Sequence, residues 1–236
     1  SMDTIKKLSD YAILNGSTIK FMGVPKTIDN DLAVTDHTPG YGSAAKYIAS
    51  ITKEVIRDGL VYGTKSVTIL EIMGRNAGWL TGAAALAKGE DCEGPDMIFL
   101  PEIPFDVDEF MKKVEQLQKE KSSVVVAVSE GVKVADGRYV CELTDNIDYV
   151  DAFGHRQLTG TARYLAERIS REVGCKTRAI EFNSLQRCAS HIVGRVDITE
   201  AFQVGGAAVK AAFEGETAKM IILKRISDDP YLCVTD

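Results

Sequence analysis

Hydrophobic and polar positions fall into alternating blocks along the chain, and these blocks predict strands and helices in turn. Two apolar runs, 66–72 and 123–128, predict strands that are buried on both faces. Amphipathic or helix-favouring blocks predict helices over 5–14, 42–58, 79–87, 107–120, 156–173 and 195–214. Weaker patterns predict strands over 17–24, 97–100, 177–182 and 218–223. The alternation predicts an α/β fold with a mainly parallel sheet covered by helices on both faces.

Composition and charge narrow the class of protein. The chain has 236 residues, of which 45% are hydrophobic and 26% charged, as in a globular protein with a substantial core. A formal net charge of -6 argues against a nucleic-acid partner. Five cysteines without zinc-ligand spacing indicate free thiols in a reducing compartment, so we expect a cytoplasmic protein. No apolar run approaches the roughly 20 residues of a membrane span, so no membrane partner is expected.

The most informative polar segment is Pro-Lys-Thr-Ile-Asp-Asn-Asp at residues 25–31, which follows the predicted strand 17–24. Open α/β sheets bind ligands at the ends of strands. There an aspartate such as Asp29 or Asp31 can take a proton from a hydroxyl or hold Mg²⁺, and Lys26 can neutralise a phosphate. A solvated turn is the alternative, because Asp-Asn-Asp is ordinary turn chemistry.

Other strand ends also carry polar residues. Met73, Gly74 and Arg75 follow one buried strand, and Glu130 follows the other. Glycine lets the backbone approach a ligand, and arginine can bind phosphate through two hydrogen bonds. Arg178 and Arg187 flank the strand at 177–182 and bracket a possible anion site. Each segment alone also fits an ordinary turn, and for Pro101-Glu102 the turn is the favoured interpretation.

Taken together, these segments resemble the phosphofructokinase family. The resemblance rests on five sets of residues in the family's order and at about its spacing: residues 25–31, Met73-Gly74-Arg75-Asn76-Ala77-Gly78-Trp79, Pro101-Glu102, Ser129-Glu130-Gly131, and Thr177-Arg178-Ala179 before Leu185-Gln186-Arg187. It covers nearly the whole chain. It implies two three-layer α/β/α domains and phosphoryl transfer to the 1-hydroxyl of fructose 6-phosphate with Mg²⁺.

The resemblance also implies roles for single residues. Asp29 takes the place of the general base, Thr27 and Ile28 lie beside the substrate, and Asp31 organises the Mg²⁺-bound donor. Met73, Gly74 and Arg75 contact the sugar phosphate, and Arg75 also stabilises charge in the transition state. Glu130 binds sugar hydroxyls. The basic residues around the 6-phosphate are Arg178 and Arg187, with Ser184 at a position where relatives carry an aromatic residue or histidine.

The phosphoryl donor is indicated by Lys26. In this family, lysine before Thr-Ile-Asp-Asn-Asp is typical of enzymes that use pyrophosphate, whereas ATP-dependent relatives often have glycine there. The segment at 153–158 also looks like the pyrophosphate branch, although a helix start that only packs fits it equally well. The residues leave two competing functions open: an ATP-dependent 6-phosphofructokinase, and a non-catalytic family member that binds sugar phosphate or regulates. Ser184, and Cys188-Ala189 in place of the family's Gly-Gly, leave the sugar contacts open.

The resemblance begins after the family's glycine-rich donor loops, so we expect an N-terminally truncated chain, inactive alone, whose first domain is incomplete. Residues 1–40 and 188–215 map to the phosphoryl-donor domain, and residues 41–187 to the fructose 6-phosphate domain. Residues 216–236 are expected to return to the sugar domain. Relatives are homodimers or homotetramers, so an oligomer is expected.

Overall fold

The computed structural model describes residues 2–143 and 159–236, and the chain divides into two compact units. The first unit comprises Ser1–Ser43 and His191–Asp236, and the second comprises Ala44–Ser190. Each unit has a hydrophobic core of its own. None of the helices in the two described ranges is both long and apolar enough to cross a bilayer.

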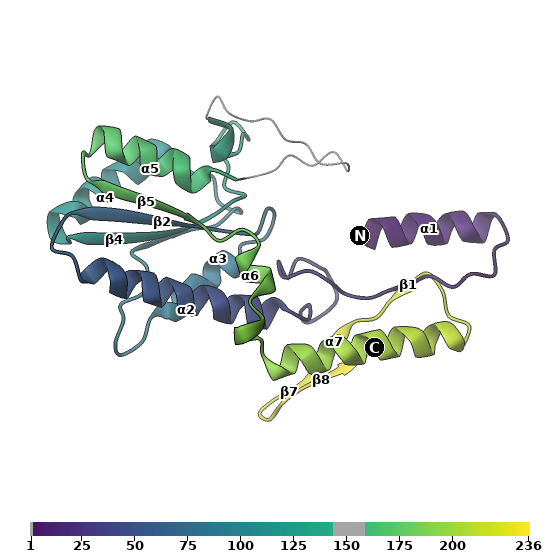
Figure 1. The fold of residues 1–236 in the computed structure, drawn as a ribbon. Coiled ribbons are helices and arrows are strands. Elements are labelled where there is room, and N and C mark those ends of the chain that lie inside the picture. The colour runs from purple at the N-terminus through teal and green to yellow at the C-terminus, as the bar shows by residue number, and fades with distance from the viewer. Residues whose placement is uncertain (1, 144–158) are drawn as a thin grey trace. The chain divides into compact units, whose positions relative to one another are not determined.

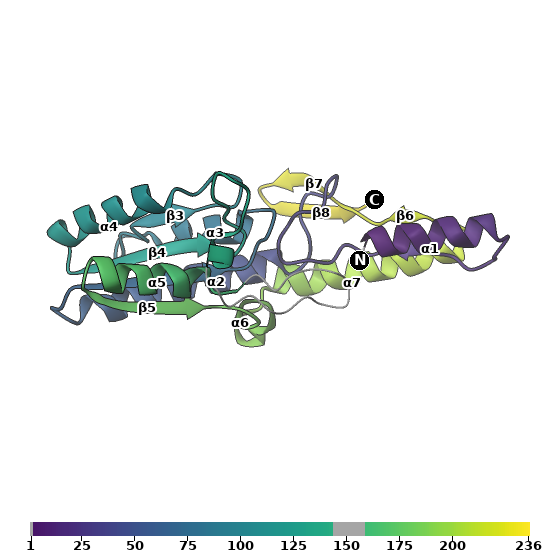
Figure 2. The same ribbon diagram turned by 90° about the horizontal axis from the view of Figure 1, so that it is seen from above.

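The second unit is built on a four-stranded sheet in the order β3-β4-β2-β5 (Figures 1 and 2). All three neighbouring pairs are parallel, as the βα alternation predicts. The strands are β2 (Ser66–Ile72), β3 (Met97–Phe99), β4 (Ser123–Ser129) and β5 (Lys176–Glu181). Every residue of β2 and β4 is buried, which is why these central strands are continuous apolar runs.

Helices cover both faces of this sheet: α4 (Val107–Glu120) and α5 (Thr161–Glu172) lie on one, and α2 (Tyr41–Leu60) and α3 (Trp79–Ala83) on the other (Figure 1). The first face holds the larger core, where Phe110 and Val114 of α4 and Leu165 of α5 are at most 1% exposed. Shorter helical segments are η1 (Ala84–Ala87), η2 (Val140–Leu143) and α6 (Leu185–Cys188).

The first unit contains α1 (Met2–Leu14), η3 (Ser190–Ile192, of which Ser190 belongs to the second unit) and α7 (Arg195–Phe213). Its strands are β1 (Met22–Gly23), β6 (Lys219–Met220), β7 (Leu223–Asp228) and β8 (Tyr231–Thr235). β1 pairs in parallel with β6, and β7 forms an antiparallel hairpin with β8. Its core is small and consists of Val204, Ala208, Ile221, Leu223 and Cys233.

The predicted α/β class is confirmed, and several boundaries differ from the sequence prediction. Of the strand expected over 17–24, only β1 pairs with another strand. The helix expected over 79–87 divides into α3 and η1, and the one expected from 156 begins, within the described residues, at Thr161. The strand expected over 218–223 is the short β6, and the β7–β8 hairpin was not predicted.

The C-terminal residues 216–236 differ most from expectation. They belong to the first unit and do not return to the second. The reason is the pairing of β6 with β1, which gives the first unit its only parallel pair among the described residues.

Candidate active site

Three of the polar segments meet at the carboxyl edge of the sheet in the second unit. β2 and β4 end in register, with Ile72 opposite Ser129, so the residues that follow them are neighbours. The N–H of Gly74 lies 3.5 Å from Oε1 of Glu130. The N–H of Met73 donates to Oε1 of Gln186, at 3.3 Å. This edge is where parallel α/β sheets bind ligands.

The turn that carries Arg75 is fixed from two sides. The Ser129 hydroxyl donates to the carbonyl of Gly74 at 2.7 Å and accepts from the N–H of Gly131 at 3.0 Å. Gly74 itself has φ 137°, a backbone conformation that favours glycine. Arg75 and Glu130 are both half-buried. The edge therefore presents one guanidinium and one carboxylate, groups that suit a phosphate and sugar hydroxyls.

Gln186 was not assigned a role from the sequence, although it lies inside the quoted Leu-Gln-Arg segment. It is 2% exposed, and its amide joins two strand ends by accepting from Met73 and donating to the carbonyl of Asn183 at 3.0 Å. A buried amide with both partners satisfied holds backbone segments in place. Gln186 thus fixes the start of α6 against the turn after β2.

Glu71 is a second residue for which the sequence predicts no role. It is 3% exposed in the middle of the sheet and accepts from the N–H groups of Gly160 at 3.3 Å and Ala162 at 2.7 Å. Burial raises the pKa of Glu71 to about 7, although the N–H of Ala162 opposes the shift; Glu181 and Glu130 add to it. The sequence signal that points to Glu71 is a single acidic residue within an otherwise apolar, buried strand. Glu71 anchors the N-terminus of α5, where Gly160 offers no capping side chain.

The Pro101-Glu102 segment forms the turn that the sequence favoured, and Glu102 in addition contacts the start of a helix. Oε1 of Glu102 accepts from the N–H of Gly78 at 2.7 Å, at the start of α3. A carboxylate at this place satisfies a helix N-terminus and is favoured by the helix dipole.

The two arginines that were expected to bracket one anion site do not come together. Arg178 lies within β5, and its guanidinium faces Asp58 at 3.6 Å and the ring of Tyr62 at 6.0 Å, both near the end of α2. Arg187 lies in α6, which follows the carboxyl end of β5, and it is exposed. Ser184, which begins α6, is also exposed. Of the two arginines, Arg187 is the one at the sheet edge that carries Arg75.

The segment at 25–31 lies in the first unit, in a loop held by hydrogen bonds within that unit. The Thr27 hydroxyl accepts from the N–H of Asp29 at 3.1 Å. Thr38 donates its hydroxyl to the carbonyl of Thr27 at 2.5 Å and its N–H to Oδ1 of Asn30 at 3.0 Å. Thr27, Ile28 and Asp29 are half-buried, whereas Lys26 and Asp31 are exposed. The loop therefore fixes the backbone around Asp29 and leaves the neighbouring charges open to a ligand.

One group of side chains in the first unit has the composition of a metal site. Asp36, His37 and Cys233 place one ligand atom each within 4.8 Å of one another. Both ring nitrogens of His37 are already engaged by carboxylates, and the guanidinium of Arg225 lies 2.9 Å from Asp36. A cation beside Asp36 disfavours a metal ion there, so we interpret the group as a hydrogen-bonded network.

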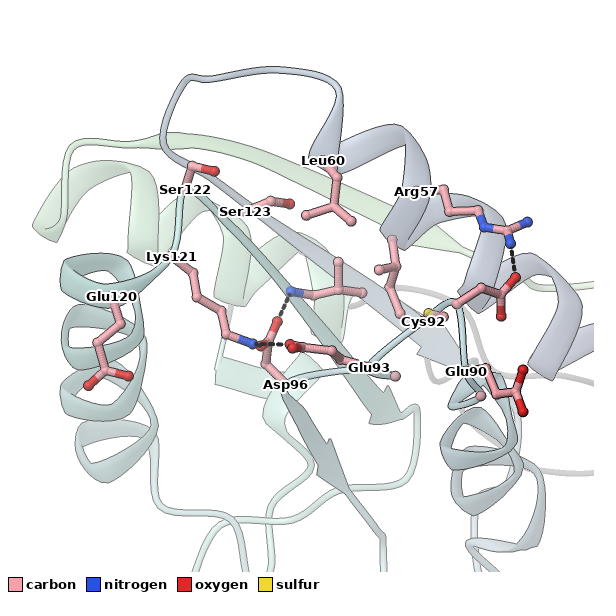
Figure 3. Close-up of a pocket in the computed structure, with 15 residues that line it drawn as sticks. Arg57, Leu60, Glu90, Cys92, Glu93, Asp96, Glu120, Lys121, Ser122 and Ser123 are labelled. Carbon is pink, nitrogen blue, oxygen red and sulfur yellow. Dashed lines mark hydrogen bonds and ion pairs between the residues drawn. The ribbon is translucent and has the colours of Figure 1, made fainter.

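A cavity of about 620 Å³ lies in the second unit at the other end of the sheet, beside the start of β4 (Figure 3). Several of its charged side chains form ion pairs: Lys121 contacts Asp96 at 2.8 Å and Glu93 at 3.1 Å. Arg57 pairs with Asp91 in the same wall. The cavity is therefore separate from the edge that carries Arg75 and Glu130. The segment at 153–158 lies outside the described residues.

Comparisons with known proteins agree with these motifs. The model of the family described as phosphofructokinase matches residues 1–212. The chain is 41% identical to a pyrophosphate–fructose 6-phosphate 1-phosphotransferase of Halomonas elongata and 43% identical to one of Xanthomonas campestris pv. campestris. Each match covers 98% of this chain and 55% of the relative.

A crystal structure of a pyrophosphate-dependent phosphofructokinase from Marinobacter aquaeolei superposes with a TM-score of 0.81 at 36% identity. The superposition covers 100% of this chain and 55% of that structure. The chain thus spans a little over half the length of the proteins it resembles.

Proposed function

Because this chain belongs to the phosphofructokinase family, we propose that the whole protein transfers a phosphoryl group from pyrophosphate to the 1-hydroxyl of fructose 6-phosphate. The observation that carries the proposal is the meeting of Gly74, Glu130 and Gln186 at one sheet edge. The similarity to pyrophosphate-dependent relatives, together with Lys26 in the loop at 25–31, supports pyrophosphate over ATP as donor.

In this reaction Asp29 takes the proton from the sugar hydroxyl as the hydroxyl oxygen attacks one phosphorus of pyrophosphate; the bridging P–O bond breaks, and inorganic phosphate leaves. Phosphoryl transfer depends mainly on positioning and on neutralising charge, so the remaining groups are cations and orienting acceptors. Lys26, which is exposed three residues before Asp29, neutralises the donor, and Arg75 stabilises the charge on the transferred group. Thr27, Ile28 and Met73 contact the substrate.

The sugar is oriented by groups of the second unit. Glu130 accepts hydrogen bonds from sugar hydroxyls, and Arg187 and Ser184 face the 6-phosphate. Asp31 fits a magnesium ligand, because it is an exposed carboxylate and Mg²⁺ prefers such oxygen donors. Bound Mg²⁺ would neutralise charge on the phosphates of the donor.

The two units would divide these tasks: the first holds the donor, and the second holds the sugar phosphate. We also propose a homo-oligomer, in which Arg178 faces the sugar phosphate of a neighbouring subunit. Arg178 points to the end of α2, away from the edge that carries Arg75, and this supports a role outside its own site. A cytoplasmic location belongs to the same proposal.

The test is an assay of the full-length gene product with fructose 6-phosphate and Mg²⁺, in which pyrophosphate and ATP are offered separately. We expect turnover with pyrophosphate. Asp29→Ser should lower kcat by about two to four orders of magnitude while sugar-phosphate binding changes little. Turnover with ATP alone would contradict the proposed donor. Sugar-phosphate binding without turnover by either donor would instead support a non-catalytic family member.

A further inference from the structure

His37 lies between two carboxylates in the first unit. Its Nδ1 is 2.8 Å from Oδ1 of Asp36, and its Nε2 is 2.6 Å from Oε2 of Glu200. The side chains of His37 and Glu200 are 13% and 5% exposed, so water screens the contact between them weakly, whereas Asp36 on the other side of the ring is exposed. An ionised carboxylate only accepts hydrogen bonds, and a neutral imidazole carries a single N–H. With both carboxylates ionised, the two contacts require both nitrogens to be protonated, which makes His37 an imidazolium.

Every element packed around His37 contributes a polar or charged group. Arg225 of β7 donates to Asp36 at 2.9 Å, and the hydroxyl of Tyr231 in β8 donates to Oε1 of Glu200 at 2.7 Å. The Tyr231 hydroxyl also lies 3.5 Å from Nε2 of His37. Other titratable or charged groups nearby are Cys233 of β8 and Asp228 of β7, which pairs with Arg225. Tyr41 of α2 and Arg195 and Asp197 of α7 line the same cavity of about 400 Å³ as His37.

Opposite charges face one another throughout this network. Asp36 and Glu200 flank His37, and Arg225 pairs with Asp36, so the buried Glu200 carboxylate and the half-buried imidazole each have a partner of opposite sign. Burial lowers the pKa of His37, but the bonds to Asp36 and Glu200 outweigh it, and the net shift is upward. Burial likewise raises the pKa of Asp36, but its bonds to Arg225 and His37 outweigh that effect, so its pKa is lowered.

The residue after His37 connects this network to the loop that carries Asp29. Thr38 is fully buried, and it bonds the carbonyl of Thr27 and the side chain of Asn30. These two residues lie on either side of Asp29 in the sequence. On the other side of His37, Thr35 donates to the His37 carbonyl at 2.9 Å and accepts from the N–H of Leu223 at 3.0 Å. Because Thr38 follows His37 directly and bonds both Thr27 and Asn30, a displacement of the His37 backbone also displaces the backbone around Asp29.

We propose that His37 is a positioning residue for Asp29: as an imidazolium between Asp36 and Glu200, it fixes the loop at 27–38 to α7. The inference rests on the proposed role of Asp29 as general base. When His37 loses its proton, one ring nitrogen presents a lone pair to a carboxylate, and one of the two bonds is replaced by repulsion. The loop then loosens, and Asp29 is less well aligned with the attacking hydroxyl.

The protonation state can be measured directly by nitrogen-15 NMR of the histidine side chains of the full-length gene product. We expect both nitrogens of His37 to carry protons at pH 7 and to titrate at higher pH than a free imidazole, because the bonds to Asp36 and Glu200 raise the pKa of His37. Glu200→Gln keeps an acceptor for His37 but removes the charge, so it should lower the pH at which His37 titrates. A His37 with a single ring proton at pH 7 would overturn the proposal.

The catalytic consequence is tested by the pH profile of phosphoryl transfer from pyrophosphate. His37→Gln should lower kcat about 10-fold at pH 7, change KM much less, and remove the loss of kcat on the alkaline side that follows the titration of His37. His191→Gln is the matched control and should keep the wild-type profile. In Glu200→Gln the alkaline loss should move to lower pH together with the NMR titration, and this variant decides the question if His37→Gln fails to fold.

The outcomes separate this inference from the proposed function. An active protein in which His37→Gln keeps the wild-type kcat and pH profile would reject the role of His37 alone. The same holds if the alkaline loss of kcat stays in place in Glu200→Gln while the NMR titration moves. A wild-type protein without phosphoryl transfer, or an Asp29→Ser variant with normal kcat, would reject the proposed function, and the role of His37 with it.

Discussion

The carbonyl oxygen of Arg75 occupies the space that a β-carbon on Gly131 would need. A side chain at Gly131 would overlap the carbonyl group and Cα of Arg75, all of which are backbone atoms that cannot rotate away. This close approach keeps Glu130 and the turn at Gly74 within hydrogen-bond distance. Glycine is therefore required at 131 by the packing of two strand ends.

Gly131→Ala should displace the turn that carries Arg75. We expect a loss of stability of about 1–3 kcal/mol from overpacking, and a fall in kcat/KM for the sugar phosphate. Gly82→Ala is the matched control, because Gly82 lies in α3 and, apart from adjacent residues and the backbone of its own helix, no atom lies within 4 Å of the added carbon. That variant should be neutral or slightly stabilising. Denaturant unfolding and steady-state kinetics of both variants check the prediction; equal behaviour would contradict it.

Glu71 should make stability depend on pH near neutrality. Its pKa is about 7 in the folded protein, above the value of 4.5 for a free side chain. Between these two values the folded protein holds a proton that the unfolded chain has lost. The free energy of unfolding therefore falls as pH rises through this window, by up to about 3 kcal/mol.

Glu71→Gln should flatten this dependence, because the glutamine does not titrate. The measurement is denaturant unfolding of both proteins at pH 5, 6 and 8, followed by a signal from the second unit. Glu115→Gln, an exposed position on α4, should leave the wild-type dependence unchanged. If Glu71→Gln keeps the wild-type slope, then Glu71 is already ionised at pH 5.

The secondary structure of the second unit was largely predictable from the sequence, because its pattern of hydrophobic and polar residues is strong. The bounds of β2 and α4 match the prediction at both ends: β2 is an apolar run buried on both faces, and α4 begins after Asp106, whose side chain accepts from the N–H of Glu109. The strand-end rule also placed Met73–Arg75 near Glu130, since parallel strands end at the same edge. The assigned roles of these residues stay predictions.

The first unit was less predictable because its contacts connect distant residues. β7 is mostly exposed and lacks the alternation of a half-buried strand, so nothing in its pattern predicted the hairpin. The bond between His37 and Glu200 spans 163 positions, and no local pattern indicates it. Arg178 and Arg187 were grouped by their spacing, but one lies within β5 and the other in the helix after it.

Asp197 should be important for the stability of the first unit. It is 7% exposed, and although it belongs to α7 it accepts from the N–H of Gly40 at 2.7 Å and from the N–H and hydroxyl of Ser43 at 2.6 and 2.5 Å. These amides are at the N-terminus of α2, where a carboxylate is also favoured by the helix dipole. Asp197→Ala should cost about 2–4 kcal/mol, because it leaves several part-buried donors unsatisfied.

Ser43→Ala is a graded comparison for Asp197→Ala. It removes one of the three bonds to Asp197, and the acceptor of the Gly194 N–H, but leaves the backbone bonds to the carboxylate. We expect a smaller loss, of about 1–2 kcal/mol, in the same unfolding measurement. A larger effect for Ser43→Ala than for Asp197→Ala would show that the serine, and not the carboxylate, is the main stabilising group.

Lys26 should affect the phosphoryl donor more than the sugar. It is exposed three residues before Asp29, on a loop whose backbone is fixed by Thr27 and Thr38, so replacing it changes charge and leaves those bonds in place. Lys26→Gly should raise KM for pyrophosphate about 10-fold and change KM for fructose 6-phosphate much less, because a compact, highly charged donor relies on each nearby cation.

Lys20→Gly, also exposed in the first unit, is the control for a general loss of positive charge. The effect should weaken as ionic strength rises, since salt screens exposed charges. If Lys26→Gly instead weakens the affinity for the sugar phosphate more than that for pyrophosphate, Lys26 faces the sugar, and the strongest sequence argument for a pyrophosphate donor fails.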